Sequence, residues 1–195
     1  MINVPEVAPL PLDEWDDSLD FIKQDMNGRP INVHSLMAHN PELLKAWWNF
    51  RNYSVKGGAL GKRYGELVIL RVATHMKAWY EWGSHVERGL ACGLSREEIE
   101  RVKTGGAAVS WSEGERALLN GIDELITSHG LSPQTHAQLR EHFSVAQIMD
   151  IIAIHGMYVT LGCMINTWGL ELDQHVKDRL PEDVTREQFE TEYPR

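Results

Sequence analysis

The sequence predicts an all-α fold, and three observations support this prediction. Apolar residues recur at helical spacing along most of the chain, and no long stretch alternates apolar and polar residues as a half-buried strand would. Several helix starts carry N-capping residues, each worth about 1 kcal/mol. The length of 195 residues, 43% of them hydrophobic, suits one core. We therefore expect a single helical domain over residues 1–195.

The N-terminal quarter should contain an arm and two helices. Three prolines among small apolar residues predict an extended arm over residues 1–14. A short helix is expected over 15–26, and the glycine and proline of segment 27–30 should end it. Asn40 is a good N-cap and proline fits the first helical position, so the next helix should run over 41–53.

Two later helices are apolar nearly all round and should form the core: 62–76 and 144–168. A helix over 78–92 should lie between them, with Gly93 as its left-handed cap. The polar tail over 173–195 should fray or pack on a neighbour. Serine N-caps open the remaining helices, and three of them are followed by Glu or Gln at the capping-box position: Ser95, Ser112, Ser132 and Ser144.

The bulk properties of the chain exclude several classes of function. The net charge of −9 argues against a nucleic-acid partner, which requires a basic surface. A small anion remains a possible ligand, because one arginine can hold a carboxylate. Cys92 and Cys163 are too few for a disulfide framework. The sequence shows neither a secretory signal pattern nor a run of about 18 apolar residues, so we expect a cytoplasmic protein without a membrane partner.

Glu66, Glu81 and His85 are the residues best suited to chemistry. Glu66 lies in an otherwise apolar helix, where a carboxylate needs a partner. Glu81 and His85 are four residues apart and share a helix face. An antiparallel helix pair would bring Glu66 near His85, and such a pair can move a proton at neutral pH. A structural hydrogen bond that pins two helices explains the pattern equally well.

Several motifs resemble the carboxymuconolactone decarboxylase and alkylhydroperoxidase D family. They are the run AWYEWGSH over 78–85, GLACGLS over 89–95, WSEGERALL over 111–119 and NTWGLEL over 166–172. The resemblance implies an all-helical chain that assembles as a homo-oligomer, a trimer or a multiple of it, with sites near subunit interfaces.

The resemblance also predicts where this chain departs from the redox branch of that family. That branch carries a glutamate, a Cys-x-x-Cys pair and a histidine, and the matching glutamate and histidine here are Glu66 and His85. The two cysteine positions hold Ala78 and Glu81. A peroxide-reducing cycle needs a low-pKa thiolate and a resolving thiol, and we expect both cysteines of this chain to serve in apolar packing. The decarboxylase-like branch, which uses no metal or organic cofactor, therefore fits better.

The resemblance implies a division of roles among the site residues. His85 would move the proton to or from carbon, Glu66 would orient or share it, and Glu81 would act as a second acid–base group or only hold His85. Substrate-binding candidates are Arg71 as a cationic anchor, Tyr80 and Trp82 as walls, and His155 on the last long helix. Salt bridging for Arg71 and core packing for the other three are the alternatives. Further basic candidates are Arg51, Arg63 and Lys77.

Three functions remain to be compared. The first is a cofactor-free lyase or isomerase that acts on a small organic acid or lactone by Glu/His proton transfer. The second is a non-catalytic oligomer that binds a ligand or serves as a scaffold. The third is a peroxide-reducing enzyme with residual redox activity. His75, Glu81 and His85 are possible metal ligands, but no HExxH-type motif accompanies them, so no metal is expected.

Overall fold

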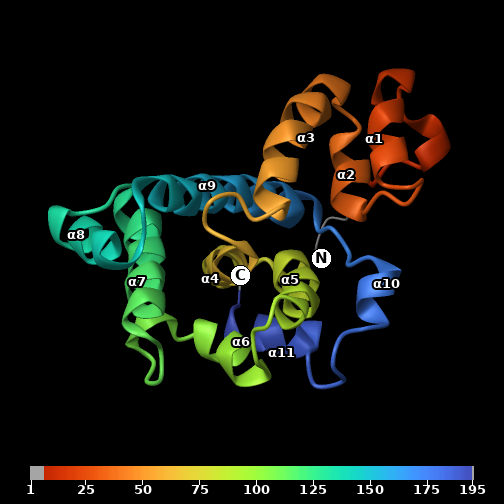
Figure 1. Cartoon of the computed structure of the whole chain (residues 1–195). Helices are drawn as coiled ribbons and strands as arrows, with labels where there is room; N and C mark the ends of the chain where they lie inside the picture. The colour runs from red at the N-terminus through yellow and green to blue at the C-terminus, as the bar shows by residue number, and fades with distance from the viewer. Residues whose placement is uncertain (1–6, 195) are drawn as a thin grey trace.

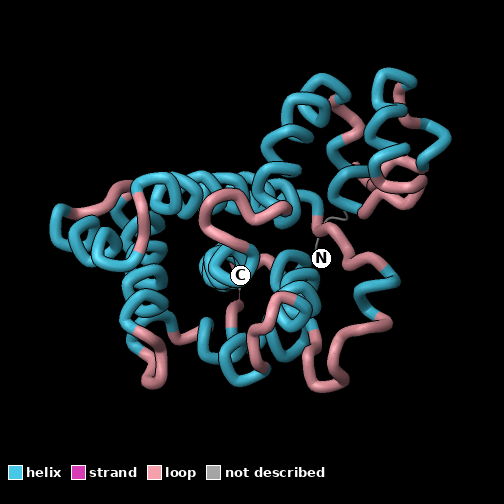
Figure 2. The backbone as a smooth tube through the Cα atoms, viewed as in Figure 1, coloured by secondary structure: helices cyan, strands magenta, loops and turns pink. Residues whose placement is uncertain are grey.

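The computed structural model describes residues 7–194, and these residues are helical without any strand, which confirms the predicted all-α class (Figure 2). Short 3-10 turns supplement the helices at Leu12–Glu14, Asp17–Leu19 and Gly105–Ala107. The α-helices are α1 (Asp20–Asp25), α2 (Asn32–Met37), α3 (Pro41–Val55), α4 (Lys62–Met76), α5 (Trp79–Ala91), α6 (Arg96–Val102), α7 (Glu113–Ser128), α8 (Pro133–His142), α9 (Val145–Trp168), α10 (Gln174–Lys177) and α11 (Arg186–Glu192).

Helices α4, α5 and α9 form the centre of the molecule. Figure 1 shows α4 and α5 side by side, with α9 passing across them and α1, α2 and α3 projecting beyond one end. Helix α4 is buried along most of its length, as its apolar sequence predicts. Lys77 adopts a left-handed conformation at the end of α4, and this tight turn folds α5 back against it.

The predicted helix starts agree closely with the structure. Ser95, Ser112 and Ser144 each accept a hydrogen bond from the backbone N–H three residues on, and each forms a complete capping box. Ser132 caps α8 through the N–H of Thr135. These signals are local, so they can be located in the sequence without the tertiary structure.

The N-terminal segment differs from its prediction. Residues 1–6 of the expected arm lie outside the described residues, and the rest of the arm ends in the 3-10 turn Leu12–Glu14. The helix expected over 15–26 is reduced to a second 3-10 turn and the short helix α1, Asp20–Asp25. The side chain of Asp16 caps that turn, so regular helix begins later than the periodicity suggests.

The C-terminal tail was expected to fray or to pack on a neighbour, but it packs on its own chain. Helices α10 and α11 both contact α5. Phe189 of α11 is buried and stacks on Trp82 of α5, with ring centroids 5.7 Å apart. Val176 of α10 is buried too, so apolar side chains fix the tail, because burying an aromatic side chain contributes more than a surface ion pair.

Helix α9 is long and apolar enough to cross a membrane by length and composition alone. Half of its apolar window is buried inside the chain. Its inner face packs on α4 and α7. This is the arrangement of a core helix in a soluble helical domain.

Candidate active site

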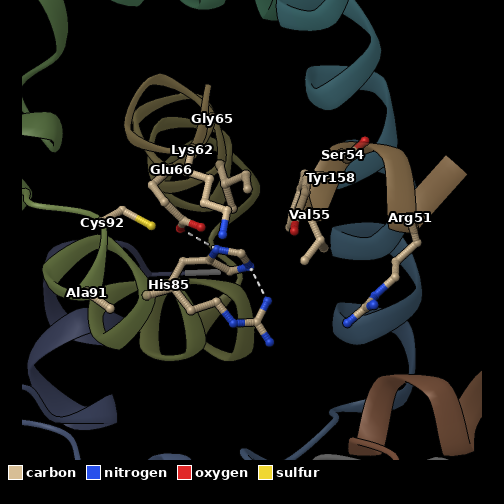
Figure 3. Close-up of a pocket in the computed structure, with 12 residues that line it drawn as sticks. Arg51, Ser54, Val55, Lys62, Gly65, Glu66, His85, Ala91, Cys92 and Tyr158 are labelled. Atoms are coloured by element: carbon tan, nitrogen blue, oxygen red, sulfur yellow. Dashed lines mark hydrogen bonds and ion pairs between the residues drawn. The ribbon is translucent and has the colours of Figure 1, made fainter. Parts of the chain in front are cut away.

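Glu66 of α4 and His85 of α5 meet at the centre of the helix pair. Nδ1 of His85 lies 2.7 Å from Oε2 of Glu66, as the spacing in the sequence predicts (Figure 3). A carboxylate only accepts hydrogen bonds, so this contact assigns the imidazole proton to Nδ1. The lone pair then lies on Nε2, the ring nitrogen that faces away from Glu66.

Burial keeps His85 neutral. The side chain is 3% exposed, and burial lowers the pKa of His85 even though the Glu66 carboxylate partly opposes this effect. The ring of Tyr158 on α9 packs edge-on against the imidazole, with centroids 5.1 Å apart. At pH 7, His85 is thus a fixed, neutral imidazole with its lone pair on Nε2, which is the form a general base requires.

Glu81 lies one turn before His85 and has the opposite protonation preference. Its Oε2 is 3.6 Å from Nε2 of His85, and its Oε1 is buried without a hydrogen-bond partner among the described residues. Burial raises the pKa of Glu81 to about 8; Arg88 opposes the rise and Glu66 adds to it. Glu81 therefore keeps its proton at neutral pH, beside a histidine that is neutral as well.

A cavity of about 340 Å³ opens on this group. Helices α4 and α5 supply one wall, with Glu66 and His85, and α3 supplies the facing wall, with Arg51, Ser54 and Val55 (Figure 3). A smaller chamber of about 30 Å³ lies beside it and is lined by residues that include Glu81 as well as His85. The two spaces share His85, Arg88, Arg51, Val55 and Tyr158, so the neutral base lies at the boundary between them and the neutral acid lies on the side of the chamber.

Arg88 is a member of the site that the sequence analysis missed. Its Nη1 lies 3.4 Å from Nε2 of His85, and it lines both the cavity and the chamber. A signal was present, since Arg88 follows His85 by three residues and Glu81 by seven, on the same face of α5. Glu66, Glu81, His85 and Arg88 thus form one cluster.

Arg71 does not reach this cluster, which corrects its expected role as a substrate anchor. Its Nε and Nη2 bind the two carboxylate oxygens of Asp123 at 2.6 and 3.0 Å. Its Nη1 donates to the carbonyls of Val102 and Lys103. All three guanidinium nitrogens already donate hydrogen bonds within the protein, so Arg71 forms the salt bridge that was the alternative to a substrate anchor.

The other three binding candidates also lie away from the main cavity. Tyr80 donates its hydroxyl to Asp173 at 2.6 Å and reaches only the wall of the small chamber. Trp82 is 1% exposed and stacks on Phe189. His155 is half-buried and lines neither space. Their packing alternatives fit these positions.

The two cysteines differ from the expectation of apolar packing. Cys163 is exposed on α9, and Cys92 is half-buried at the edge of the cavity (Figure 3). Burial raises the pKa of the Cys92 thiol, and Glu66 adds to the rise. His75 binds Asp123 at 2.9 Å. Within residues 7–194, no group of three or more His, Cys, Asp or Glu side chains is placed to hold a metal ion.

Comparison with protein families agrees with this fold and site. Residues 41–124 match the model of the carboxymuconolactone decarboxylase family, and this segment holds all four residues of the cluster. This segment of the chain is therefore similar to the carboxymuconolactone decarboxylase family, the same family that the sequence motifs resemble. No curated protein sequence matches the chain significantly.

Solved structures share the whole fold. The alkylhydroperoxidase AhpD core of a peroxidase-related protein from Ralstonia eutropha JMP134 superposes with a TM-score of 0.75 at 20% identity, over 90% of this chain and 96% of that one. A protein of unknown function from Agrobacterium tumefaciens gives a TM-score of 0.64 at 26% identity, over 70% and 94%. The debrominase Bmp8, as a cysteine-to-alanine variant bound to 2,3,4-tribromopyrrole, gives 0.71 at 16% identity, over 89% and 94%. The AhpD-like fold of this chain is thus established.

Proposed function

We propose that this protein is a lyase or isomerase, decarboxylase-like in chemistry, that transfers a proton on a small carboxylate or lactone without a metal or organic cofactor. One observation carries the proposal: a neutral imidazole at the wall of the main cavity lies 3.6 Å from a protonated carboxyl group that lines the adjoining chamber. Two groups with pKa values driven in opposite directions are the usual arrangement for acid–base catalysis at neutral pH.

His85 and Glu81 take complementary roles in this mechanism. Nε2 of His85 removes a proton from a carbon of the substrate, and the electron pair of that C–H bond moves into a neighbouring carbonyl. Glu66 accepts the hydrogen bond from Nδ1 and stabilises the imidazolium that forms. Glu81 or the imidazolium then returns a proton to carbon. In a decarboxylation, the bond to the carboxylate breaks in place of the C–H bond, its electron pair moves into the neighbouring carbonyl as CO₂ departs, and the proton that Glu81 gives then replaces the lost group at carbon.

The thiols support this interpretation over peroxide reduction. A peroxidatic thiol needs a depressed pKa, whereas burial and Glu66 raise that of Cys92. Cys163 is exposed on α9 and lines neither the cavity nor the chamber. Residual redox activity is therefore the weakest of the three functions.

We further propose a homo-oligomer, a trimer or a multiple of it, in the cytoplasm. Val145, Met149 and Ile152 follow one face of α9 at helical spacing and are 52%, 64% and 43% exposed. Such an apolar stripe on a helix surface favours a subunit contact. The same feature supports the alternative function, a non-catalytic ligand-binding or scaffold oligomer.

Deuterium exchange tests the enzyme against this alternative and does not require the natural substrate. Small carboxylic acids and lactones are incubated with the protein in D₂O, and deuterium at carbon is followed by NMR. We expect exchange with at least one compound, a loss of about 10²–10⁴-fold in His85→Asn, and little change in His155→Asn, a matched histidine outside the cavity. Exchange that survives in His85→Asn, or none with the unmodified protein, rejects the enzyme.

A further inference from the structure

Arg88 is a partly buried cation whose hydrogen-bonding capacity is largely unused. Its guanidinium contacts Nε2 of His85 at 3.4 Å, and no carboxylate of the described chain lies within ion-pair distance of it. By contrast, all three guanidinium nitrogens of Arg71 already donate hydrogen bonds to the protein. A guanidinium carries five donors and binds a carboxylate through two of them. Arg88 therefore has donors left for a ligand.

Arg51 reaches the same space from the facing wall. It belongs to α3, on the wall that faces His85 (Figure 3). Arg51 lines both the cavity and the chamber, as Arg88 does. Its guanidinium lies over the ring of Trp48, 4.9 Å from the centroid, and Nη1 donates to Asn52. Both neighbours also donate to Asp25, whose carboxylate acts on Arg51 only at longer range, and no ion pair to Arg51 occurs within residues 7–194.

The cavity is locally positive in a chain of net charge −9. Arg51, Arg88 and Lys62 line it, and Glu66 is the one carboxylate beside them among the described residues. Glu81 keeps its proton at neutral pH, because burial raises its pKa to about 8. His34, which lines the chamber with an unpartnered Nδ1, is neutral, because burial lowers its pKa to about 3 with help from Arg51 and Arg88. A surplus of positive charge in a recessed site attracts a small anion.

We propose that Arg88 and Arg51 bind a carboxylate group that the substrate keeps throughout the reaction. The inference rests on the proposed function and adds the substrate class to it: a small acid whose reacting carbon lies beside the anchored carboxylate. The position follows from the 3.4 Å contact, since a carboxylate on Arg88 brings its neighbouring carbon within reach of Nε2 of His85.

The anchored carboxylate is retained for an energetic reason. Ion pairing with arginine stabilises the anion in the ground state, whereas departure as neutral CO₂ would break the pair. The same pairing favours loss of a proton from the next carbon, because it stabilises the negative charge that develops there. A decarboxylation in this site therefore removes a second carboxyl group, and an isomerisation needs only one.

Binding of benzoate and its neutral isostere benzamide tests the anchor, with calorimetry as the readout. We expect the unmodified protein to bind benzoate at least about tenfold more tightly, the value of one charge-assisted hydrogen bond. Arg88→Gln should remove this preference, Arg88→Lys should keep part of it, and Arg51→Gln should reduce it. Arg101→Gln is the matched control, because Arg101 also lies 4.9 Å over an indole ring, that of Trp111, and lies outside both spaces.

The design separates the anchor from the chemistry. His85→Asn should keep the benzoate preference, because it removes the base and leaves both arginines. A preference that persists in His85→Asn while deuterium exchange fails with the unmodified protein would reject proton transfer and keep the anchor. Equal affinity for benzoate and benzamide in the unmodified protein, or a preference unchanged in both Arg88→Gln and Arg51→Gln, overturns the anchor. If Arg88→Gln does not fold, Arg51→Gln and Arg88→Lys decide the question.

Discussion

Two arginine networks lie on neighbouring helices and have opposite character. On α4, Arg71 and His75 both bind the carboxylate of Asp123, and Arg71 also donates to two backbone carbonyls. On α5, Arg88 contacts one imidazole nitrogen, beside a glutamate with an unpartnered oxygen. The first network satisfies its donors and the second does not. Proteins rarely leave buried polar groups unpaired without a functional reason.

The backbone around the two networks reinforces the contrast. Gly105 approaches the Arg71 guanidinium so closely that a Cβ there would lie 2.8 Å from Nη2, and its φ of +73° suits glycine. The chain thus encloses Arg71 and admits no ligand. Arg88 instead borders a cavity of about 340 Å³. We infer that an arginine whose donors are all paired within the protein stabilises the fold, whereas one with unpaired donors beside a cavity binds a ligand.

The largest expected effect tests that lesson directly. Arg71→Ala should lower the free energy of unfolding by about 3 kcal/mol, because it removes the cation from half-buried Asp123 and the donor from the carbonyls of Val102 and Lys103. Arg88→Ala should cost about 1 kcal/mol or less, since no carboxylate depends on it within ion-pair distance. Urea unfolding of both variants measures the difference. Equal losses would show that Arg88 is structural too.

Glu81→Gln should have the next largest effect and the opposite sign. The folded pKa of Glu81, about 8, lies above its ordinary value of 4.5, so the unfolded chain releases the proton first as pH rises. Stability from this group is complete below pH 4.5 and is lost as pH rises towards 8. Glutamine copies the protonated acid, so Glu81→Gln should gain on the order of 2–3 kcal/mol at pH 7 and lose the pH dependence.

Thermal unfolding at pH 5 and pH 8 provides the control for Glu81→Gln. The gain in stability should be much smaller at pH 5 than at pH 8. At pH 5, Glu81 ionises much less favourably in the unfolded chain, so the free-energy difference between the two protonation states is small. A gain that does not depend on pH would mean that packing, and not the buried carboxyl group, explains it.

The pH dependence of the deuterium-exchange rate should be bell-shaped, and this effect should be smaller than the two changes in stability. The rate should rise through a pKa below 6.5, where His85 becomes neutral, and fall near pH 8, where Glu81 ionises. On the acid limb and on the alkaline limb, the exchange rate should change about tenfold per pH unit. The Glu81→Gln variant should lack the alkaline limb if glutamate is the group that titrates. An alkaline limb that remains in this variant assigns it to another residue.

Local signals account for most of what the sequence predicted. Helix α4 has the predicted bounds because periodicity and glycine mark it, and Glu66 meets His85 because a tight turn after α4 leaves little freedom. The role of Arg71 was wrong because its partner Asp123 lies 52 residues away, beyond any local pattern. The sequence shows which side chains are chemically able, whereas the fold decides which of them are already paired.

The smallest expected effect concerns the cysteines. At pH 7.5, iodoacetamide should modify exposed Cys163 before half-buried Cys92, whose thiol pKa is raised by burial. Cys92→Ser should change the exchange rate by about twofold or less, which corresponds to about 0.5 kcal/mol in activation free energy. The thiol lines the edge of the cavity and takes no part in proton transfer. Mass spectrometry of the time course and the exchange assay measure the two effects. A loss in Cys92→Ser comparable to that in His85→Asn would place the thiol in the mechanism and restore the redox hypothesis, so the cysteines provide the finest test of whether this cavity performs acid–base chemistry.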